Sequence, residues 1–195
     1  MALREVQAAL ARLFTDEAAR AAFLRDPRGV GRSLGLDEND ANTLARLAPD
    51  ALRQFAGSLK AKRALDARKA MPLTAKALGD AFAMQFRAAT AALPGGVSRV
   101  AEAQALAMRL AALAREYKLE PLWISDLARY EAAFVEASHK RFGLRLRLFR
   151  FPIGSVAAAL YVGASVGDIA PRTTIGIWAR LPRGRLFHRL RPLMR

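Results

Sequence analysis

The hydrophobic pattern of the chain changes its period once, close to Gly143, and this change limits the possible folds most strongly. Before it, apolar residues recur every three or four positions, as they do on one face of an α-helix. After it, Leu144, Leu146 and Leu148 alternate with arginines, which is the pattern of a half-buried strand. We therefore predict an α+β protein that is mainly α, with N-terminal helical bundles followed by a small C-terminal antiparallel sheet.

Composition and turn signals divide the chain into three predicted parts. The Met71-Pro72 break closes an N-terminal helical module over residues 1–71. A second helical bundle is predicted over residues 72–143, and it begins with one long helix from Thr74. Residues 144–195 are then expected to form a basic region that contains a strand, a helix and a hairpin.

The last helix of the second bundle joins it to the basic region. Four large side chains share one face of this helix, because they follow one another at spacings of 4, 3 and 4. They are Trp123, Leu127, Tyr130 and Phe134. We predict that this stripe is buried. Asp126 and Glu131 lie five positions apart, hence on different faces, and capping or ion pairing explains each of them better than paired catalysis.

The basic region has the sequence signals of three strands. They are predicted at residues 144–151, 173–180 and 185–191, with a buried helix around residues 156–162 and a turn at residues 182–184. In the first strand we expect the leucines to face the core, so that Arg145 and Arg147 point away from it. We expect His188 to lie at the surface.

The net charge of +15 is concentrated in the basic region. Residues 1–141 carry 22 Lys and Arg against 16 Asp and Glu, whereas residues 142–195 carry 10 Arg against the single Asp168. A general preference for arginine is one explanation, and a basic surface that binds an anionic partner is the other. The composition alone leaves both explanations open.

Residue usage argues against several classes of chemistry. The chain has no cysteine and only two histidines, His139 and His188, which lie far apart in sequence. We therefore expect no cofactor, no metal site and no catalytic residues in this chain, and no known catalytic motif occurs in it. The uncharged stretch at residues 151–167 is short for a membrane span, and charges precede any apolar run at the N-terminus, so we expect a cytoplasmic protein without a membrane partner.

Two groups of short sequence segments resemble known families. Residues 13–18 (LFTDEA), 22–27 (AFLRDP) and 34–36 (LGL) resemble a small helical module. This module occurs in the small subunit of aromatic-ring-opening dioxygenases and in the leaders of some ribosomally made, modified peptides. The resemblance implies a helical bundle.

The second resemblance extends over about residues 74–190. Residues 78–82 (LGDAF), 121–123 (PLW) and 126–131 (DLARYE) look like the helper subunits encoded beside multinuclear iron oxygenases that modify peptides, as in methanobactin and bufferin biosynthesis. Residues 171–178 (PRTTIGIW) and 181–186 (LPRGRL) look like the hairpin that follows in such proteins. The resemblance implies a non-catalytic partner that docks on an iron-containing oxygenase and presents a precursor peptide.

A basic sheet with an open edge can add a peptide strand through backbone hydrogen bonds, while its arginines select acidic side chains. The predicted peptide contacts are Arg145, Arg147, Arg150, Thr174, Trp178 and Arg180. The predicted contacts to the partner enzyme are Trp123, Asp126, Arg129 and Glu131. The alternative hypothesis is a nucleic-acid-binding protein, in which the arginines follow phosphates and an aromatic ring stacks on bases.

Overall fold

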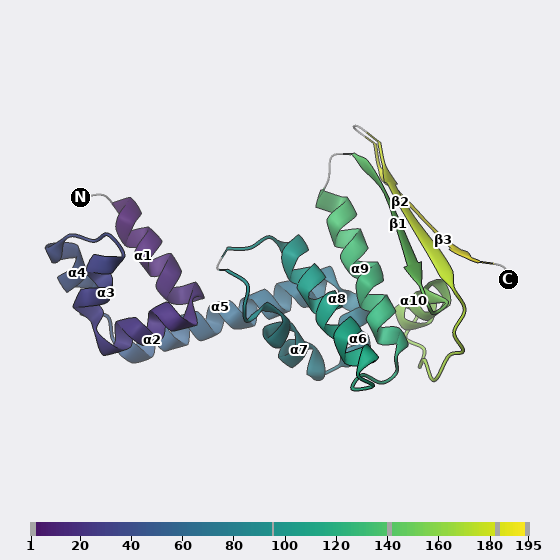
Figure 1. Ribbon diagram of the computed structural model, residues 1–195, viewed down its shortest axis with the longest axis horizontal. Helices are drawn as coiled ribbons and strands as arrows, with labels where there is room; N and C mark the ends of the chain where they lie inside the picture. Colours follow the sequence, from purple (N-terminus) through teal and green to yellow (C-terminus); the bar gives the residue numbers. More distant parts are fainter. Residues whose placement is uncertain (1–2, 95, 140–141, 182–183, 194–195) are drawn as a thin grey trace. The chain divides into compact units, whose positions relative to one another are not determined.

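The computed structural model describes residues 3–94, 96–139, 142–181 and 184–193 (Figure 1). In this part of the chain, ten helices accompany one three-stranded antiparallel sheet near the C-terminus, which confirms the predicted fold class. The residues gather into two compact units with separate hydrophobic cores. The first unit comprises Met1–Arg63 with Leu93–Val97, and the second comprises Ala64–Ala92 with Ser98–Arg195.

Short helices build the first unit. They are α1 (Leu3–Thr15), α2 (Glu17–Arg25), α3 (Pro27–Ser33), α4 (Glu38–Leu44) and the first part of α5 (Pro49–Ala70). Aspartates begin three of them: Asp16, Asp26 and Asp37 each accept a hydrogen bond from a backbone N–H in the first turn. The core of this unit contains Leu13 and Phe23.

The second unit contains the rest of α5 and all later elements. Its helices are α6 (Pro72–Leu78), α7 (Ala81–Thr90), α8 (Arg99–Arg115), α9 (Trp123–His139) and α10 (Ile153–Tyr161), and its strands are β1 (Gly143–Phe149), β2 (Thr174–Arg180) and β3 (Leu186–Pro192). The predicted boundary between residues 143 and 144 falls inside this unit, because β1 and β2 pack on α9. Of the predicted turn, Pro182 and Arg183 lie outside the described residues.

The helix predicted to run on from Thr74 is instead two helices. Gly79 has a φ of 54°, a left-handed conformation that glycine adopts more readily than other residues. This conformation ends α6, and α7 begins at Ala81. The apolar pattern of the two helices is continuous in the sequence, so periodicity alone did not reveal the break.

Helix α9 is the central element of the second unit. It packs against α6, α8, α10 and the first two strands. Trp123, Leu127 and Tyr130 are buried and Phe134 is half-buried, so the predicted stripe is in the core. Trp123 also donates a hydrogen bond of 3.1 Å from its Nε1 to the carbonyl of Gly167.

The sheet has the strand order β1-β2-β3, with both pairs antiparallel. Leu146 lies opposite Ile177, which lies opposite Arg189. The inner face packs on α9 through Phe149 and Trp178, both buried. On this face a Cβ added to Gly176 would come within 2.7 to 2.9 Å of ring atoms of Trp178 and Phe149, so the packed rings leave no room for a side chain there.

The first strand turns its leucines outward, which is the reverse of the prediction. Leu144, Leu146 and Leu148 are 67%, 51% and 56% exposed. Arg145 and Arg147 instead point inward and form ion pairs with Glu136 of α9, at 2.7 and 3.7 Å. A half-buried carboxylate on the central helix therefore decides which face of the strand lies inside, because its charge needs positive partners.

His188 also faces inward, where the sequence predicted a surface residue. Its ring lies 4.6 Å from that of Phe134, 5.3 Å from that of Trp178 and 5.4 Å from that of Tyr130, between centroids. Its Nε2 is buried and has no hydrogen-bond partner among the described residues. Burial lowers the pKa of His188 below its ordinary value of 6.5, since desolvation disfavours the charged ring.

This burial predicts a pH-dependent stability. The folded protein protonates His188 at a lower pH than the unfolded chain does, so stability should fall as the pH decreases below about 6.5. Replacing the residue, His188→Phe, should remove this part of the pH dependence. Urea unfolding of both proteins between about pH 5 and pH 8 measures the effect. If the free energy of unfolding changes equally with pH in the two proteins, His188 is not a buried neutral residue in the folded protein.

Candidate functional site

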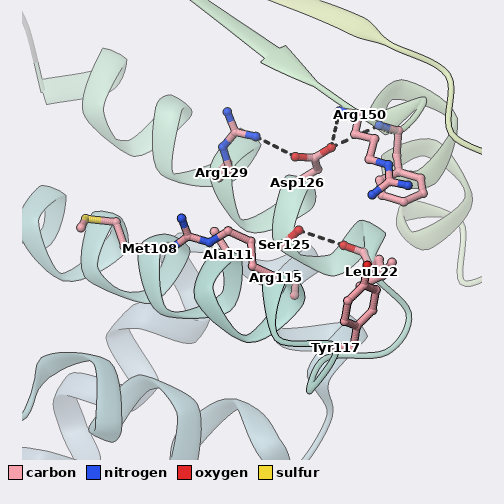
Figure 2. Close-up of a pocket in the computed structure, with 11 residues that line it drawn as sticks. Met108, Ala111, Arg115, Tyr117, Leu122, Ser125, Asp126, Arg129 and Arg150 are labelled. Atoms are coloured by element: carbon pink, nitrogen blue, oxygen red, sulfur yellow. Dashed lines mark hydrogen bonds and ion pairs between the residues drawn. The ribbon is translucent and has the colours of Figure 1, made fainter.

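Asp126 joins the first turn of α9 to the segment that follows β1 (Figure 2). Its Oδ2 accepts hydrogen bonds from the backbone N–H groups of Arg150 and Phe151, and its Oδ1 accepts one of 2.8 Å from Arg129 Nη1. The other terminal nitrogen of Arg129 donates to the carbonyl of Leu148 at 3.0 Å. One buried carboxylate and one arginine therefore fix the end of β1 against α9.

A groove lies beside this contact, and α8, α9, β1 and the residues just after β1 line it. It consists of a hollow of about 530 Å³ and a neighbouring hollow of about 270 Å³. The two hollows share Met108, Ala111 and Arg129 as lining residues. Small side chains of α9, Ala132 and Ala133, line the second hollow and leave its space open. We call the two hollows together the α8–α9 groove.

Positive charge exceeds negative charge in the α8–α9 groove. Its described lining residues include four arginines and two carboxylates: Arg115, Arg129, Arg147 and Arg150, with Asp126 and Glu136. The carboxylates are already engaged, since Asp126 binds Arg129 and Glu136 binds Arg147 and a second arginine from β1.

Two of the groove arginines keep their charge available. Within the described residues, Arg115 and Arg150 form no ion pair. The guanidinium of Arg150 lies 5.6 Å from the ring centroid of Phe151, a contact that orients the side chain and leaves its N–H donors available. The groove can therefore attract a carboxylate or another anion.

The free edge of β1 lies next to this groove. The carbonyls of Leu146 and Leu148 accept hydrogen bonds from the side chains of Arg147 and Arg129, so they point away from β2. In an antiparallel ladder the N–H and C=O of one residue point to the same side. Among the described residues β1 pairs only with β2, and its outward N–H groups are therefore donors that a further strand could use.

The structure places the six predicted peptide contacts in different surroundings. Arg147 and Arg150 line the α8–α9 groove, whereas Arg145 is half-buried in its ion pair with α9. Thr174 and Trp178 are buried on the inner face of the sheet. Arg180 donates from its Nη1 to the carbonyl of Ser138 at 2.7 Å, near the end of α9. Of the first two predicted strands, β1 lies at an edge of the sheet and β2 is its central strand.

The predicted contacts to a partner enzyme are mostly internal. Trp123, Asp126 and Glu131 are at most 6% exposed, and only Arg129 of the four lies partly at the surface. Their side chains hold the fold together, so a partner has little access to them.

Glu131 fixes the start of α6. Its carboxylate accepts hydrogen bonds from the backbone N–H groups of Leu73 and Thr74, at 2.9 and 2.7 Å. Burial raises the pKa of Glu131, and the two helix N–H groups oppose this shift because they favour the charged form. The role of this residue is therefore to cap a helix from across the core.

The sequence did not reveal that α8 forms one side of the α8–α9 groove. Tyr117 continues the apolar spacing of Leu106, Leu110 and Leu113, which is typical of a buried stripe, but it is 80% exposed and lines the larger hollow. Met108 is 73% exposed and lies in both hollows. The position of Met108 outside the stripe of Leu106 and Leu110 was the available signal.

Comparisons with protein-family models, with curated proteins and with solved structures find no match. The described part of the chain contains no helix that is both long and apolar enough to span a membrane. In the same part, no three His, Cys, Asp or Glu side chains come together as metal ligands.

The contacts of Asp126 predict a large effect of removing it. The replacement Asp126→Ala leaves two backbone N–H groups and Arg129 without their acceptor, so the free energy of unfolding should fall by about 3 kcal/mol or more. Urea unfolding measures the change. Asp80→Ala is the control, since Asp80 begins α7 without a side-chain capping bond and is exposed. Equal effects of the two changes would show that Asp126 does not hold β1.

Proposed function

We propose that this chain is a non-catalytic partner protein that binds an extended peptide along the free edge of β1 and presents it to a modifying enzyme. One observation carries the proposal: outward backbone groups of β1 lie beside a groove that contains unpaired arginines. Backbone groups of this kind give affinity for any extended peptide, and the side chains around them give selectivity.

The size of the α8–α9 groove agrees with a short peptide strand. Its α8 wall extends from Gln104 to Arg115, and eleven helical steps of 1.5 Å give roughly 17 Å. An extended peptide rises about 3.3 Å per residue, so about five residues occupy this length. A segment of that length can make several backbone hydrogen bonds to β1.

The charge of the groove favours an acidic segment. Arg115 and Arg150 can each donate charge-assisted hydrogen bonds to a carboxylate, and such bonds are stronger than those between neutral groups. The alanines of α8 and α9 leave room for side chains that point from the peptide into the groove. We therefore propose a peptide with at least one Asp or Glu near its centre.

The identity of the enzyme rests on the resemblance of residues 74–190 to helper subunits. By that resemblance the enzyme is a multinuclear iron oxygenase, the peptide is a ribosomally made precursor, and the iron belongs to the oxygenase. The chain then supplies binding and orientation, and the oxygenase supplies the chemistry.

A proline in β1 tests the strand-addition mode. Leu146→Pro removes an N–H on the free edge, while the N–H groups that face β2 remain. Binding of a fluorescein-labelled extended peptide rich in Thr and Glu should weaken about tenfold or more, as measured by fluorescence anisotropy. Leu146→Ala keeps the N–H and serves as the matched control, which should bind nearly as the parent does. Circular dichroism checks that both variants fold.

The same assay decides between the peptide and nucleic acid. Peptide binding should weaken modestly between about 50 and about 200 mM salt, whereas binding through several phosphate contacts should fall by about 10³-fold or more. Tight binding of random single-stranded DNA that is steeply salt-dependent and unaffected by Leu146→Pro would overturn the proposal.

Charge reversal tests the role of the groove arginines. The double replacement Arg115→Glu with Arg150→Glu should weaken binding of the acidic peptide about tenfold or more, because two charge-assisted contacts become repulsive. Arg28→Glu with Arg172→Glu makes the same change of charge at exposed positions outside the groove. If both pairs weaken binding equally, the net charge of the protein is responsible and the groove is not.

A further inference from the structure

The outer face of the sheet is an ordered apolar surface. The register places its residues in three rows across the strands: Leu144, Ala179 and Phe187; Leu146, Ile177 and Arg189; Leu148, Ile175 and Arg191. Six of these nine side chains are large and apolar. The three leucines and Phe187 are each more than half exposed. We call these nine residues the outer sheet face.

The packing of the sheet explains why these side chains stay uncovered. Helix α9 packs on the inner face of the sheet (Figure 1). Phe149, Trp178 and the two paired arginines lie on this face. Helix α10 also lies on the inner side of the sheet. Its Gly154 lies against the side chain of Leu190 in β3, and this side chain points inward because those of Arg189 and Arg191 point outward. Within the second unit, no described helix covers the three leucines and Phe187, which remain more than half exposed.

The outer sheet face is large enough to indicate an interaction. Three strands spaced by about 4.8 Å, each of seven residues rising about 3.3 Å, cover roughly 14 by 23 Å, or about 300 Å². This footprint includes Arg189 and Arg191, and its apolar part approaches the lower end of the about 300–600 Å² that the largest, often functional, apolar patch of a monomer covers. A stable interface needs about 800 Å² from each partner, so the occupant must also contact the surrounding polar rim.

The two arginines of the outer sheet face define the chemistry of the occupant. Arg189 and Arg191 complete two of the rows, both are exposed, and residues 142–195 contain only one acidic residue, Asp168. We propose that the outer sheet face docks a protein whose apolar contact surface is flanked by carboxylates. This docking surface is separate from the α8–α9 groove and does not depend on peptide binding.

Two other occupants fit less well. A second copy of this chain carries the same arginines and a net charge of +15, so face-to-face pairing brings like charges together. A membrane surface is usually bound through an amphipathic helix with aromatic anchors, and this face is a sheet without Trp or Tyr. A protein whose apolar contact surface is flanked by carboxylates complements both the apolar residues and the two arginines of the outer sheet face.

The experiment begins with site-specific photo-crosslinking. A benzophenone amino acid is placed at position 187, and in a second protein at position 65, where Leu65 of α5 is also about half exposed. Both full-length proteins are made in the cells that normally contain the chain and irradiated. We expect a protein that crosslinks from position 187 only. That protein is then purified, and its affinity for the chain is measured by titration calorimetry.

Variants of the chain then decide whether the crosslinked protein binds as proposed. Leu144→Ser with Phe187→Ser, and separately Arg189→Glu with Arg191→Glu, should each raise the Kd about tenfold or more. Leu65→Ser with Met84→Ser is the matched control at exposed apolar positions on helices, and it should leave the Kd nearly unchanged. Binding of the acidic peptide to the groove should persist in all three, which distinguishes this surface from the proposed peptide site.

Three results would overturn the proposal. The first is that no protein crosslinks from position 187, or that the affinity of the crosslinked protein is unchanged by both outer-face variants. The second is sedimentation with vesicles of phosphatidylcholine and phosphatidylglycerol that is lost in Leu144→Ser with Phe187→Ser, which assigns the face to a membrane. The third is a dimer, detected by light scattering, that the same variant dissociates.

Discussion

The arrangement of the second unit depends on three carboxylates of helix α9, of which two are buried and one is half-buried. Asp126, Glu131 and Glu136 follow one another at intervals of five residues, so each points in a different direction from the helix. Asp126 binds the end of β1, Glu131 binds the start of α6, and Glu136 binds two arginines of β1. Burying a charge is unfavourable unless it is fully paired, so each of these contacts specifies one arrangement of its neighbour.

These same contacts create the groove and its excess charge. Arg129 is engaged by Asp126, and the inward arginines of β1 are engaged by Glu136, which fixes the strand at the side of α9. The small residues of α8 and α9 then leave space beside the strand. Arg115 and Arg150 form no ion pair within the described residues, so their N–H donors remain for a ligand. The structural acids thus account for which arginines are available for binding.

Sequence periodicity predicted the elements of the second unit better than it predicted their orientation. The period-2 pattern located β1, and the spacing of Trp123, Leu127 and Tyr130 located the core face of α9. The face of β1 that lies inside could not be predicted, because it depends on Glu136, a residue of another element. The same holds for His188, whose burial follows from rings supplied by α9 and β2.

The candidate site was recognised only in part for a related reason. Arg147 and Arg150 could be named from the basic strand, but Met108, Arg115 and Tyr117 belong to a helix whose exposed face carries no distinctive motif. Their relevance comes from being opposite the free edge of β1. Contacts between distant segments cannot be read from one sequence without an estimate of how the elements pack.

Strand β1 connects the two proposed surfaces. Its alternate residues, Leu144, Leu146 and Leu148, direct their side chains to the outer sheet face, while the carbonyls of the last two point to the free edge. A peptide that adds to this edge would become a fourth strand, and its outward side chains would extend the outer sheet face by one more row. A protein docked on that face could then contact the bound peptide directly. One strand would thus both hold the peptide and place it within reach of a second protein.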